Sequence, residues 1–446
     1  MADWMVRTLN FRRGELAPAL LAALLFFCVL CGYFFLRPVR EAMGVSRGMD
    51  ELRWLFVVTS VASLVAVLAF GGAVSRVDRR RALPIGYGFV MICLAGFAGL
   101  LIADAAGGGG IIGSDAQTAL SRNVGYTYYV WLSVINLFAT SLFWAYMVDI
   151  FDSEQGKRVF AFIGVGGTLG AMAGGWATTA IAGLTHSPYL PAGLMLTGAA
   201  FFGAAIVVMR LLDGVVSARR AAARPASAAP PAAETLGGGF LDGATAALKS
   251  PYLLGIGGYI ALLAVSNTMI YFAQANIILD STDTFSQRVR SFALFDALAE
   301  TTVLLTQLFI TTRIIRRLGV GWTLAILPLV TAAGFAALAI WPVLGMMAVF
   351  QALHRGARHA ISRPARETLF AVLSPADKYK AKPVVDVFVY RGGDVAGAGI
   401  DALLRLAGLT LAGIAAATLP LAAAWTALSV ALGRAQRKKE SESPQL

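Results

Sequence analysis

The chain alternates between long apolar stretches and short polar segments. A helix needs about twenty consecutive, predominantly apolar residues to cross a bilayer. Twelve stretches suit this requirement, six on each side of a polar break near the middle of the chain. They cover residues 17–36, 52–74, 83–106, 126–150, 159–184, 189–212, 252–278, 289–312, 322–340, 344–370, 383–406 and 409–432. The pattern predicts an all-α integral membrane protein with twelve transmembrane helices.

The composition supports this prediction and excludes a soluble enzyme. Of the 446 residues, 58% are hydrophobic and 14% are charged, and the mean hydropathy is +0.71. Soluble domains usually have about one quarter of their residues charged. Cys28 and Cys31 have a CxxC spacing, but they lie inside an apolar stretch, where thiols are expected to pack. We therefore expect no enzyme activity, no cofactor and no metal.

The net charge of +12 follows membrane topology rather than a nucleic-acid-binding pattern. Lys and Arg cluster in alternate loops, for example at 79–81, 313–317 and 434–439. The positive-inside rule places these loops and both termini in the cytoplasm. The basic N-terminal segment is followed by an apolar run without a small-residue cleavage site, which predicts an uncleaved first span. We expect a multi-pass protein of the bacterial cytoplasmic (inner) membrane.

A segment rich in Ala, Pro and Gly, residues 213–250, divides the chain and is typical of a flexible cytoplasmic linker. A weak repeat supports the division, since Tyr33-Phe34 recurs as Tyr271-Phe272 at an offset of 238 residues. We predict an N-terminal six-helix half (1–212), the linker, and a C-terminal six-helix half (251–446).

The tenth apolar stretch contains arginines, which are costly inside a bilayer and usually face a protein interior or a watery cavity. At 3.6 residues per turn, one stripe of this stretch would carry Gln351, Arg355, Arg358, Ser362 and Arg366. This predicts a polar face that attracts anions. The alternative is snorkelling, in which the arginines reach the headgroups, and it applies most to the residues at the end of the stretch.

Two carboxylates one helical turn apart, Asp296 and Glu300, lie in the eighth stretch. They can form ion pairs with arginines, balance a substrate, or accept a proton. In the seventh stretch, Asn267, Tyr271 and Gln274 are similarly clustered; they can contact a ligand or bond neighbouring helices.

Gly166, Gly170 and Gly174 recur every four residues inside the fifth stretch. No strand is predicted before them, so the pattern does not indicate a phosphate-binding loop. Small residues at this spacing let two helices approach closely, and we expect helix packing here.

Six plus six spans with a long central loop resemble the major facilitator superfamily, whose substrate site lies near the membrane midplane. A Gly, acidic and basic motif between the second and third spans is typical of that superfamily. Its counterpart here contains Gly71, Arg76 and Arg79, with Ser75 at the acidic position and Asp78 at a small-residue position. The resemblance implies a gating role for Arg76, Asp78 and Arg79; anchoring by the positive-inside rule is the alternative.

Further blocks resemble the ATP/ADP translocase family of intracellular bacteria and plastids. The blocks consist of Arg37, Arg40 and Glu41; Leu142, Phe143 and Trp144; Glu154, Lys157, Arg158 and Phe160; Arg366 and Glu367; Lys378, Lys380 and Lys382; and Asp386, Arg391 and Gly393. Asp394 stands where that family typically has Lys. The resemblance implies nucleotide exchange, with Lys157, Arg158, Arg366 and Glu367 in gating positions.

From these features we expect alternating-access transport of an organic anion, most specifically ATP/ADP-type exchange. Arg37, Arg40 and Arg391 are the expected anion ligands, and Arg355 and Arg358 extend the approach to them. The alternative to anion binding by Arg391 is a structural ion pair with Asp386 or Asp394. A proton-coupled carrier of another organic anion and a membrane scaffold or sensor remain the competing functions. The expected partners are an anionic small molecule and the lipid bilayer; a monomer is compatible with these features.

Overall fold

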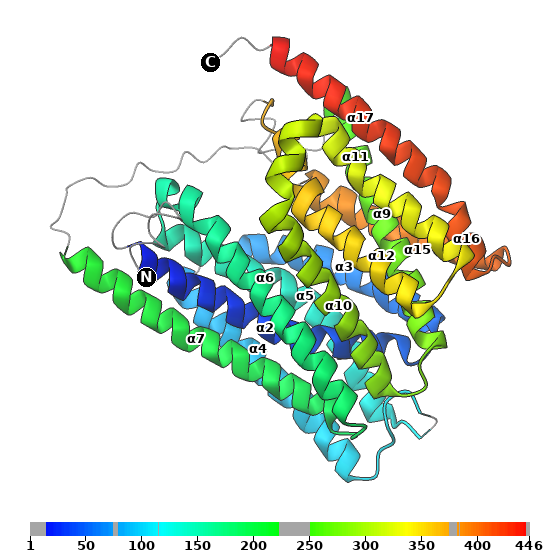
Figure 1. Cartoon of the computed structure of the whole chain (residues 1–446). Coiled ribbons are helices and arrows are strands. Elements are labelled where there is room, and N and C mark those ends of the chain that lie inside the picture. Colours follow the sequence, from blue (N-terminus) through cyan, green and yellow to red (C-terminus); the bar gives the residue numbers. More distant parts are fainter. Residues whose placement is uncertain are drawn as a thin grey trace. The chain divides into compact units, whose positions relative to one another are not determined.

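The computed structural model describes residues 15–74, 79–114, 116–222, 250–373, 381–382 and 384–442, and within these ranges the chain is helical, with no strand (Figure 1). The first set of helices is α2 (Leu16–Val45), α3 (Met49–Val74), α4 (Arg79–Ala106), α5 (Ala119–Ile150), α6 (Ser153–Leu184) and α7 (Leu190–Ala222). The second set is α9 (Pro251–Asp280), α10 (Phe285–Phe309), α11 (Thr311–Ile340), α12 (Leu344–Gly356), η1 (Ala357–Ser362), α13 (Arg363–Leu369), η2 (Val384–Val389), α15 (Tyr390–Leu406), α16 (Leu411–Ala417) and α17 (Leu419–Glu442).

All twelve predicted stretches coincide with helical segments of the described chain. Nine of the described helices are individually long and apolar enough to cross a membrane. The protein is therefore a multi-pass membrane protein with an all-α fold, as the hydropathy pattern predicts.

Helix boundaries differ from the apolar stretches where charge or a breaker occurs. The first stretch ends at Leu36 in the sequence, whereas α2 continues through Arg37 and Pro38 to Val45. Likewise, α7 continues past Leu212 to Ala222, so the first residues of the expected linker are helical. The remainder of that linker, 223–249, lies outside the described residues.

The tenth and eleventh stretches each contain a π-helical segment. The tenth consists of α12, η1 and α13, and the eleventh of η2 followed by α15. A π segment adds a residue to the turn and often occurs at functional sites. Both π segments lie beside charged residues considered below.

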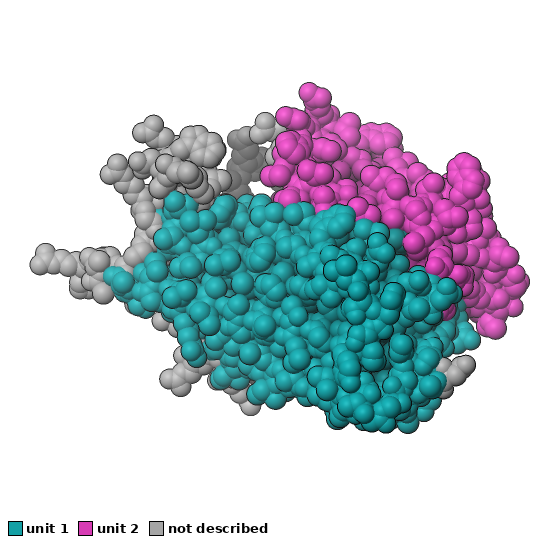
Figure 2. Space-filling model, turned by 60° about the horizontal axis from the view of Figure 1, so that its bottom comes forward, with its two compact units in different colours: residues 1–231, 282–297 teal, residues 232–281, 298–446 magenta. Residues whose placement is uncertain are grey.

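The chain forms two compact units, coloured separately in Figure 2. Unit 1 comprises Met1–Pro231 with Thr282–Ala297, and unit 2 comprises Ala232–Ser281 with Leu298–Leu446. Sequence order places residues 282–297 with the second half, but in the structure they pack in unit 1. Consequently α10 contributes its first half to unit 1 and its second half to unit 2.

Unit 1 is built around α2, which packs on α6, α7 and α5. The predicted packing role of the α6 glycines is confirmed, because a Cβ on any of the three would collide with a main-chain oxygen of α2. Such a Cβ would lie 2.5 Å from the oxygen of Ala23 for Gly166, 2.3 Å from that of Phe27 for Gly170, and 2.6 Å from that of Cys31 for Gly174.

Unit 2 has a matching pair of helices, α9 and α15, together with α11 packed on α17. Here too a glycine makes the contact, since a Cβ on Gly393 of α15 would lie 2.9 Å from the Ala261 oxygen of α9. The buried Tyr259 and Trp425 rings pack edge to face at 5.4 Å in the core of this unit. The first and fifth predicted spans of each half thus form equivalent close pairs.

Candidate functional site

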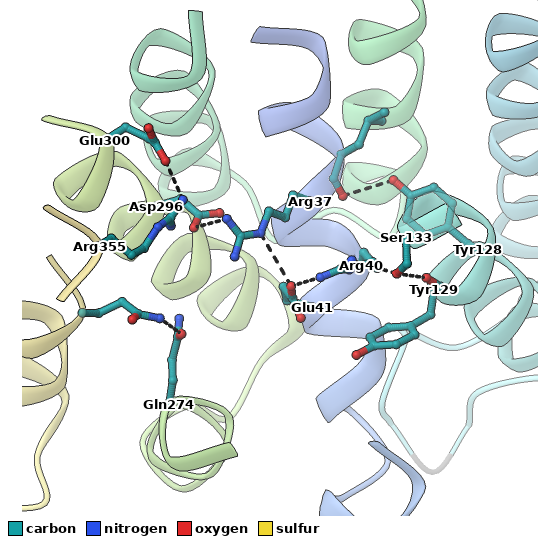
Figure 3. Close-up of polar contacts among 12 residues, drawn as sticks. Arg37, Arg40, Glu41, Tyr128, Tyr129, Ser133, Gln274, Asp296, Glu300 and Arg355 are labelled. Atoms are coloured by element: carbon teal, nitrogen blue, oxygen red, sulfur yellow. Dashed lines mark hydrogen bonds and ion pairs between the residues drawn. The ribbon is translucent and has the colours of Figure 1, made fainter. Parts of the chain in front are cut away.

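A cluster of charges in unit 1 surrounds Arg37 on α2 (Figure 3). The Arg37 guanidinium lies 2.9 Å from the Asp296 carboxylate of α10 and 3.7 Å from the Glu41 carboxylate. Glu41, one turn along α2, also pairs with Arg40. Two arginines and two carboxylates make the cluster electrically neutral, which is how charges persist inside an apolar helix bundle.

Arg40 points toward α5. Its Nη1 donates to the Ser133 hydroxyl at 2.8 Å, and its guanidinium lies 5.2 Å from the centre of the Tyr129 ring. Tyr128, from the same helix, donates to the main-chain oxygen of Leu36 at 3.1 Å. These contacts fix the charged end of α2, and they explain why the helix continues past the apolar stretch.

In unit 2 the central ion pair joins Arg355 of α12 to Glu300 of α10 at 2.5 Å. Arg355 is 8% exposed, and its partner is similarly protected. Gln351, one turn earlier, donates to Gln274 of α9 at 2.5 Å. The prediction that Arg355 faces a protein interior is confirmed, and snorkelling does not describe it.

Arg358 makes a different set of contacts. Its Nη2 donates to the Tyr390 hydroxyl at 2.8 Å, and Asn267 donates to the same hydroxyl at 3.2 Å. Within the described part of the chain, no carboxylate lies in ion-pair range of Arg358. Arg358 is therefore a half-buried cation held by the hydroxyl and the ring of Tyr390.

Arg391 forms the ion pair foreseen as its structural alternative, with Asp394 at 3.0 Å. Asp394 is buried and also accepts from Thr268 at 3.4 Å. Asp386, the other possible partner of Arg391, lies 3.7 Å from Arg366. Each of these two arginines is thus neutralised within its own part of unit 2.

The residues of the polar stripe predicted for the tenth stretch contact several neighbouring helices of unit 2. The π segment Ala357–Ser362 interrupts the 3.6-residue period on which that stripe rests, and Gln351 before it and Ser362 at its end both bond α9. Arg355 meets α10 and Arg358 meets α15, whereas Ser362 bonds the Tyr259 hydroxyl at 2.6 Å in the buried core.

The expected gating residues are described only in part. Arg76 and Asp78 lie outside the described residues, as do the side chains of Arg79 and Lys157. Arg158 donates to Glu15 at 2.8 Å and so ties the start of α6 to the residue preceding α2.

At the other predicted gate, Glu367 pairs with Lys382 and is exposed. Arg363 is exposed and Arg366 is half-buried, as expected for residues near the end of the tenth stretch. In the seventh stretch, Tyr271 is half-buried with its ring 5.5 Å from that of Phe272. Asn267 and Gln274 bond neighbouring helices.

Sequence reasoning missed several partners of the expected site residues. Ser133 and Tyr129 lie far along the chain from Arg40, and Tyr390 is equally remote from Asn267. A hydroxyl in an apolar stretch gives no signal of its own, because it can always bond the preceding helical turn. Only the packing of helices identifies these groups as partners of the site residues.

Arg355, Arg358 and Arg391 differ in the groups that hold them. Arg355 pairs with Glu300 and Arg391 pairs with Asp394, whereas Arg358 bonds the Tyr390 hydroxyl. A guanidinium bonded only to hydroxyl or amide groups can exchange those bonds for bonds to an anion. Anion binding is the chemistry best matched to these groups.

Neither the protein-family models nor the curated proteins compared with the chain gave a match. Solved transporter structures do match it. The nucleoside transporter NupG is 13% identical, with a TM-score of 0.57 over 96% of this chain and 99% of that chain. A bacterial homologue of the lysosomal transporter Spinster is 14% identical, with a TM-score of 0.56 over 97% and 99%. A POT family transporter in complex with 5-aminolevulinic acid is 10% identical, with a TM-score of 0.60 over 94% and 96%.

At these identities the likeness establishes the fold. The chain has the two-domain, major facilitator-like fold of these membrane transporters. Their cargoes differ widely, so the fold leaves the substrate to be argued from the site.

Proposed function

We propose that this protein transports an organic anion by alternating access, and that its specific activity is exchange of nucleotides or nucleoside phosphates. The support comes from the transporter fold, from arginines inside apolar helices, and from the resemblance of several charged blocks to ATP/ADP translocases. The nucleoside transporter among the similar structures indicates that this fold can accommodate a nucleoside.

Arg358 is the observation that carries the proposal. It is held by the Tyr390 hydroxyl rather than by a carboxylate, so a phosphate can approach it without first displacing a fixed negative charge. Asn267, which shares that hydroxyl, supplies an amide for a polar part of the ligand. Guanidinium groups suit phosphates because they offer paired donors and stay charged.

The neighbouring ion pairs compensate two of the arginines before substrate binds. Arg391 is paired with Asp394, and Arg355 with Glu300, so neither cation depends on substrate for a counter-charge. A phosphate that binds Arg391 replaces one anionic partner by another. An anionic partner therefore compensates the desolvation of the arginine both with and without bound substrate. This allows the substrate to bind and to be released.

Exchange is favoured over one-way movement by electrostatics. One charge crossing 100 mV changes the free energy by about 2.3 kcal/mol, so four charges moving alone against an inside-negative potential would cost about 9 kcal/mol. Exchange of a four-charge for a three-charge anion moves one net charge. The substrate class we propose therefore predicts strong stimulation by anion on the opposite side.

Proton-coupled transport of another organic anion is the second candidate, and the Arg355–Glu300 pair favours it. A carboxylate at this position can alternate between an arginine and a proton. Under this mechanism a proton gradient alone drives uptake, and replacement of Glu300 by Gln removes the drive but leaves exchange intact.

The test uses purified protein in liposomes loaded with unlabelled ATP and challenged with labelled ADP, ATP or other organic anions. We expect labelled nucleotide to enter faster when nucleotide is inside. Arg358→Ala should weaken the apparent affinity by about tenfold or more, because a hydrogen bond to a charged group contributes about 1.5–3 kcal/mol. Arg363→Ala is the matched control, since Arg363 is exposed and lies in the same stretch.

Uptake that does not depend on internal nucleotide and increases only with a proton gradient would favour the proton-coupled mechanism over exchange. Equal effects of the two substitutions would remove Arg358 from the site. Expression and insertion are measured separately for each variant.

A further inference from the structure

One end of unit 2 carries exposed basic side chains from two helices. Arg313 and Arg317 lie in the first turns of α11, and the last turns of α17 supply Arg434, Arg437 and Lys438. All five side chains are exposed. We call them the α11–α17 basic surface. The proposed transport site uses none of them.

A close helix contact brings these residues to the same end of the unit. The red α17 runs beside the yellow α11 in Figure 1. A Cβ on Gly433 would lie 2.3 Å from the Cα of Gly321, so the two helices touch through their main chains. Arg317 is four residues before Gly321, and Arg434 and Arg437 are one and four residues after Gly433, so these three arginines lie close to the contact.

The backbone of α11 also changes direction here. Gly319 has φ 69° and ψ 172°, a non-helical conformation that separates the first turns from the rest of the helix. Positive φ is easily adopted by glycine. The segment with Arg313 and Arg317 is therefore a distinct basic turn that precedes the span.

The other side of α17 is committed to packing. Gln436 donates to the main-chain oxygen of Thr368 at 3.3 Å, and the Lys439 ammonium lies 5.6 Å from the centre of the Tyr252 ring. Leu432 is buried. The exposed Arg434, Arg437 and Lys438 take no part in these contacts.

Exposed apolar side chains adjoin the basic ones. Leu318 is 46% exposed and Trp322 is 55% exposed. Trp is enriched where a membrane protein meets the headgroup layer, and exposed apolar groups on a spanning helix contact acyl chains. Such neighbours are typical of a basic residue at headgroup depth, which is where we expect Arg317. Among the side chains described at these two helix ends, Glu440 is the acidic one, so positive charge prevails.

We propose that the α11–α17 basic surface binds the head groups of anionic phospholipids. The basic groups match the phosphate charge, and Leu318 and Trp322 match the acyl chains beside it. This goes beyond the positive-inside effect, which sets orientation, because it assigns a lipid-binding site that depends on the tertiary contact between α11 and α17.

The experiment measures thermal unfolding of the full chain in neutral detergent as phosphatidylglycerol or phosphatidylcholine is added. We expect phosphatidylglycerol to raise the midpoint at low salt and phosphatidylcholine to have little effect. The variant R317Q/R434Q/R437Q should need at least roughly tenfold more phosphatidylglycerol for the same shift, since basic residues near an anionic surface each strengthen its attraction severalfold. High salt should reduce the wild-type shift.

A matched control is R122Q/R210Q/R290Q, which removes three other exposed arginines. It should respond to phosphatidylglycerol as the wild type does. Equal responses of wild type and R317Q/R434Q/R437Q would overturn the proposal, as would equal losses in both triple variants. An identical shift with inorganic phosphate would show anion binding without the lipid contact and would also overturn it. Should the first triple variant fail to fold, R317Q and R437Q are measured singly against R122Q.

Discussion

Three arginines inside these helices are held in specific ion pairs. Arg37 meets Asp296, Arg355 meets Glu300, and Arg391 meets Asp394. Removing one partner of a buried pair leaves an uncompensated charge, which costs more than removing both. Substitution of a single member of a pair should therefore change stability or transport measurably.

For the Arg355–Glu300 pair we expect Glu300→Gln to lower stability by about 3–5 kcal/mol, as is usual when a buried pair loses one member. The double variant Glu300→Gln/Arg355→Gln should recover much of this loss. Thermal or denaturant unfolding of the purified protein in detergent measures both. Additive losses in the double variant would show that the two side chains do not stabilise one another.

In the transport assay, Glu300→Gln should impair transport more than membrane insertion. Its Arg355 partner is then a buried cation without its carboxylate, and it competes for the substrate anion. The measurement is exchange rate per inserted molecule across a range of pH. Unchanged exchange with unchanged pH dependence would reduce Glu300 to a tolerated structural residue.

Arg391 tests recognition geometry separately from charge. Arg391→Lys keeps the charge but loses the planar paired donors, so phosphate-bearing substrates should bind more weakly, and Arg391→Ala should weaken them further. Equilibrium binding of labelled nucleotide to purified variants measures this. Equal affinities for Arg, Lys and Ala at this position would exclude a direct contact.

At the scale of elements, close helix pairs depend on glycine. A Cβ on Gly170 would lie 2.3 Å from the Phe27 oxygen, whereas one on Gly164 of the same helix would meet nothing within 4 Å. We expect Gly170→Ala to destabilise the protein by about 1–3 kcal/mol through overpacking. Gly164→Ala should be neutral or stabilising, because Ala favours helix by about 0.5–1 kcal/mol.

Unfolding of the two glycine variants under identical conditions checks this contrast. Equal stabilities would mean that α2 and α6 are less closely packed than the structure shows. The comparison is internal to one helix, so the membrane environment and helix propensity are matched.

For the whole molecule, the charge pattern predicts that residues 213–250 and both termini are cytoplasmic. In a background without Cys28, Cys31 and Cys93, Ser227→Cys should react with an impermeant thiol reagent only from the cytoplasmic side. Ser114→Cys should react from the outside. Labelling of intact cells against inverted vesicles measures the side, and external labelling at position 227 would reverse the topology.

The sequence by itself determined the all-α architecture. Apolar runs of span length depend on transfer free energies of individual residues, which local composition records. The alternation of basic loops indicates the sidedness, which stays a prediction. The same reasoning identified the regularly spaced glycines of α6 as a packing face. It also marked Arg37, Asp296, Glu300 and Arg355 as unusual, because a charge in an apolar stretch is costly wherever it lies.

Only the tertiary structure decided which of these charges are partners. Arg37 and Asp296 are far apart along the chain, and no local pattern records their distance. The π segment at Ala357–Ser362 likewise has no signal in the sequence, since the extra residue in a turn is set by packing of neighbouring helices rather than by apolar periodicity. Arg358 bonds the Tyr390 hydroxyl and has no carboxylate in ion-pair range among the described residues, and that contact between separate helices distinguishes it from Arg37, Arg355 and Arg391.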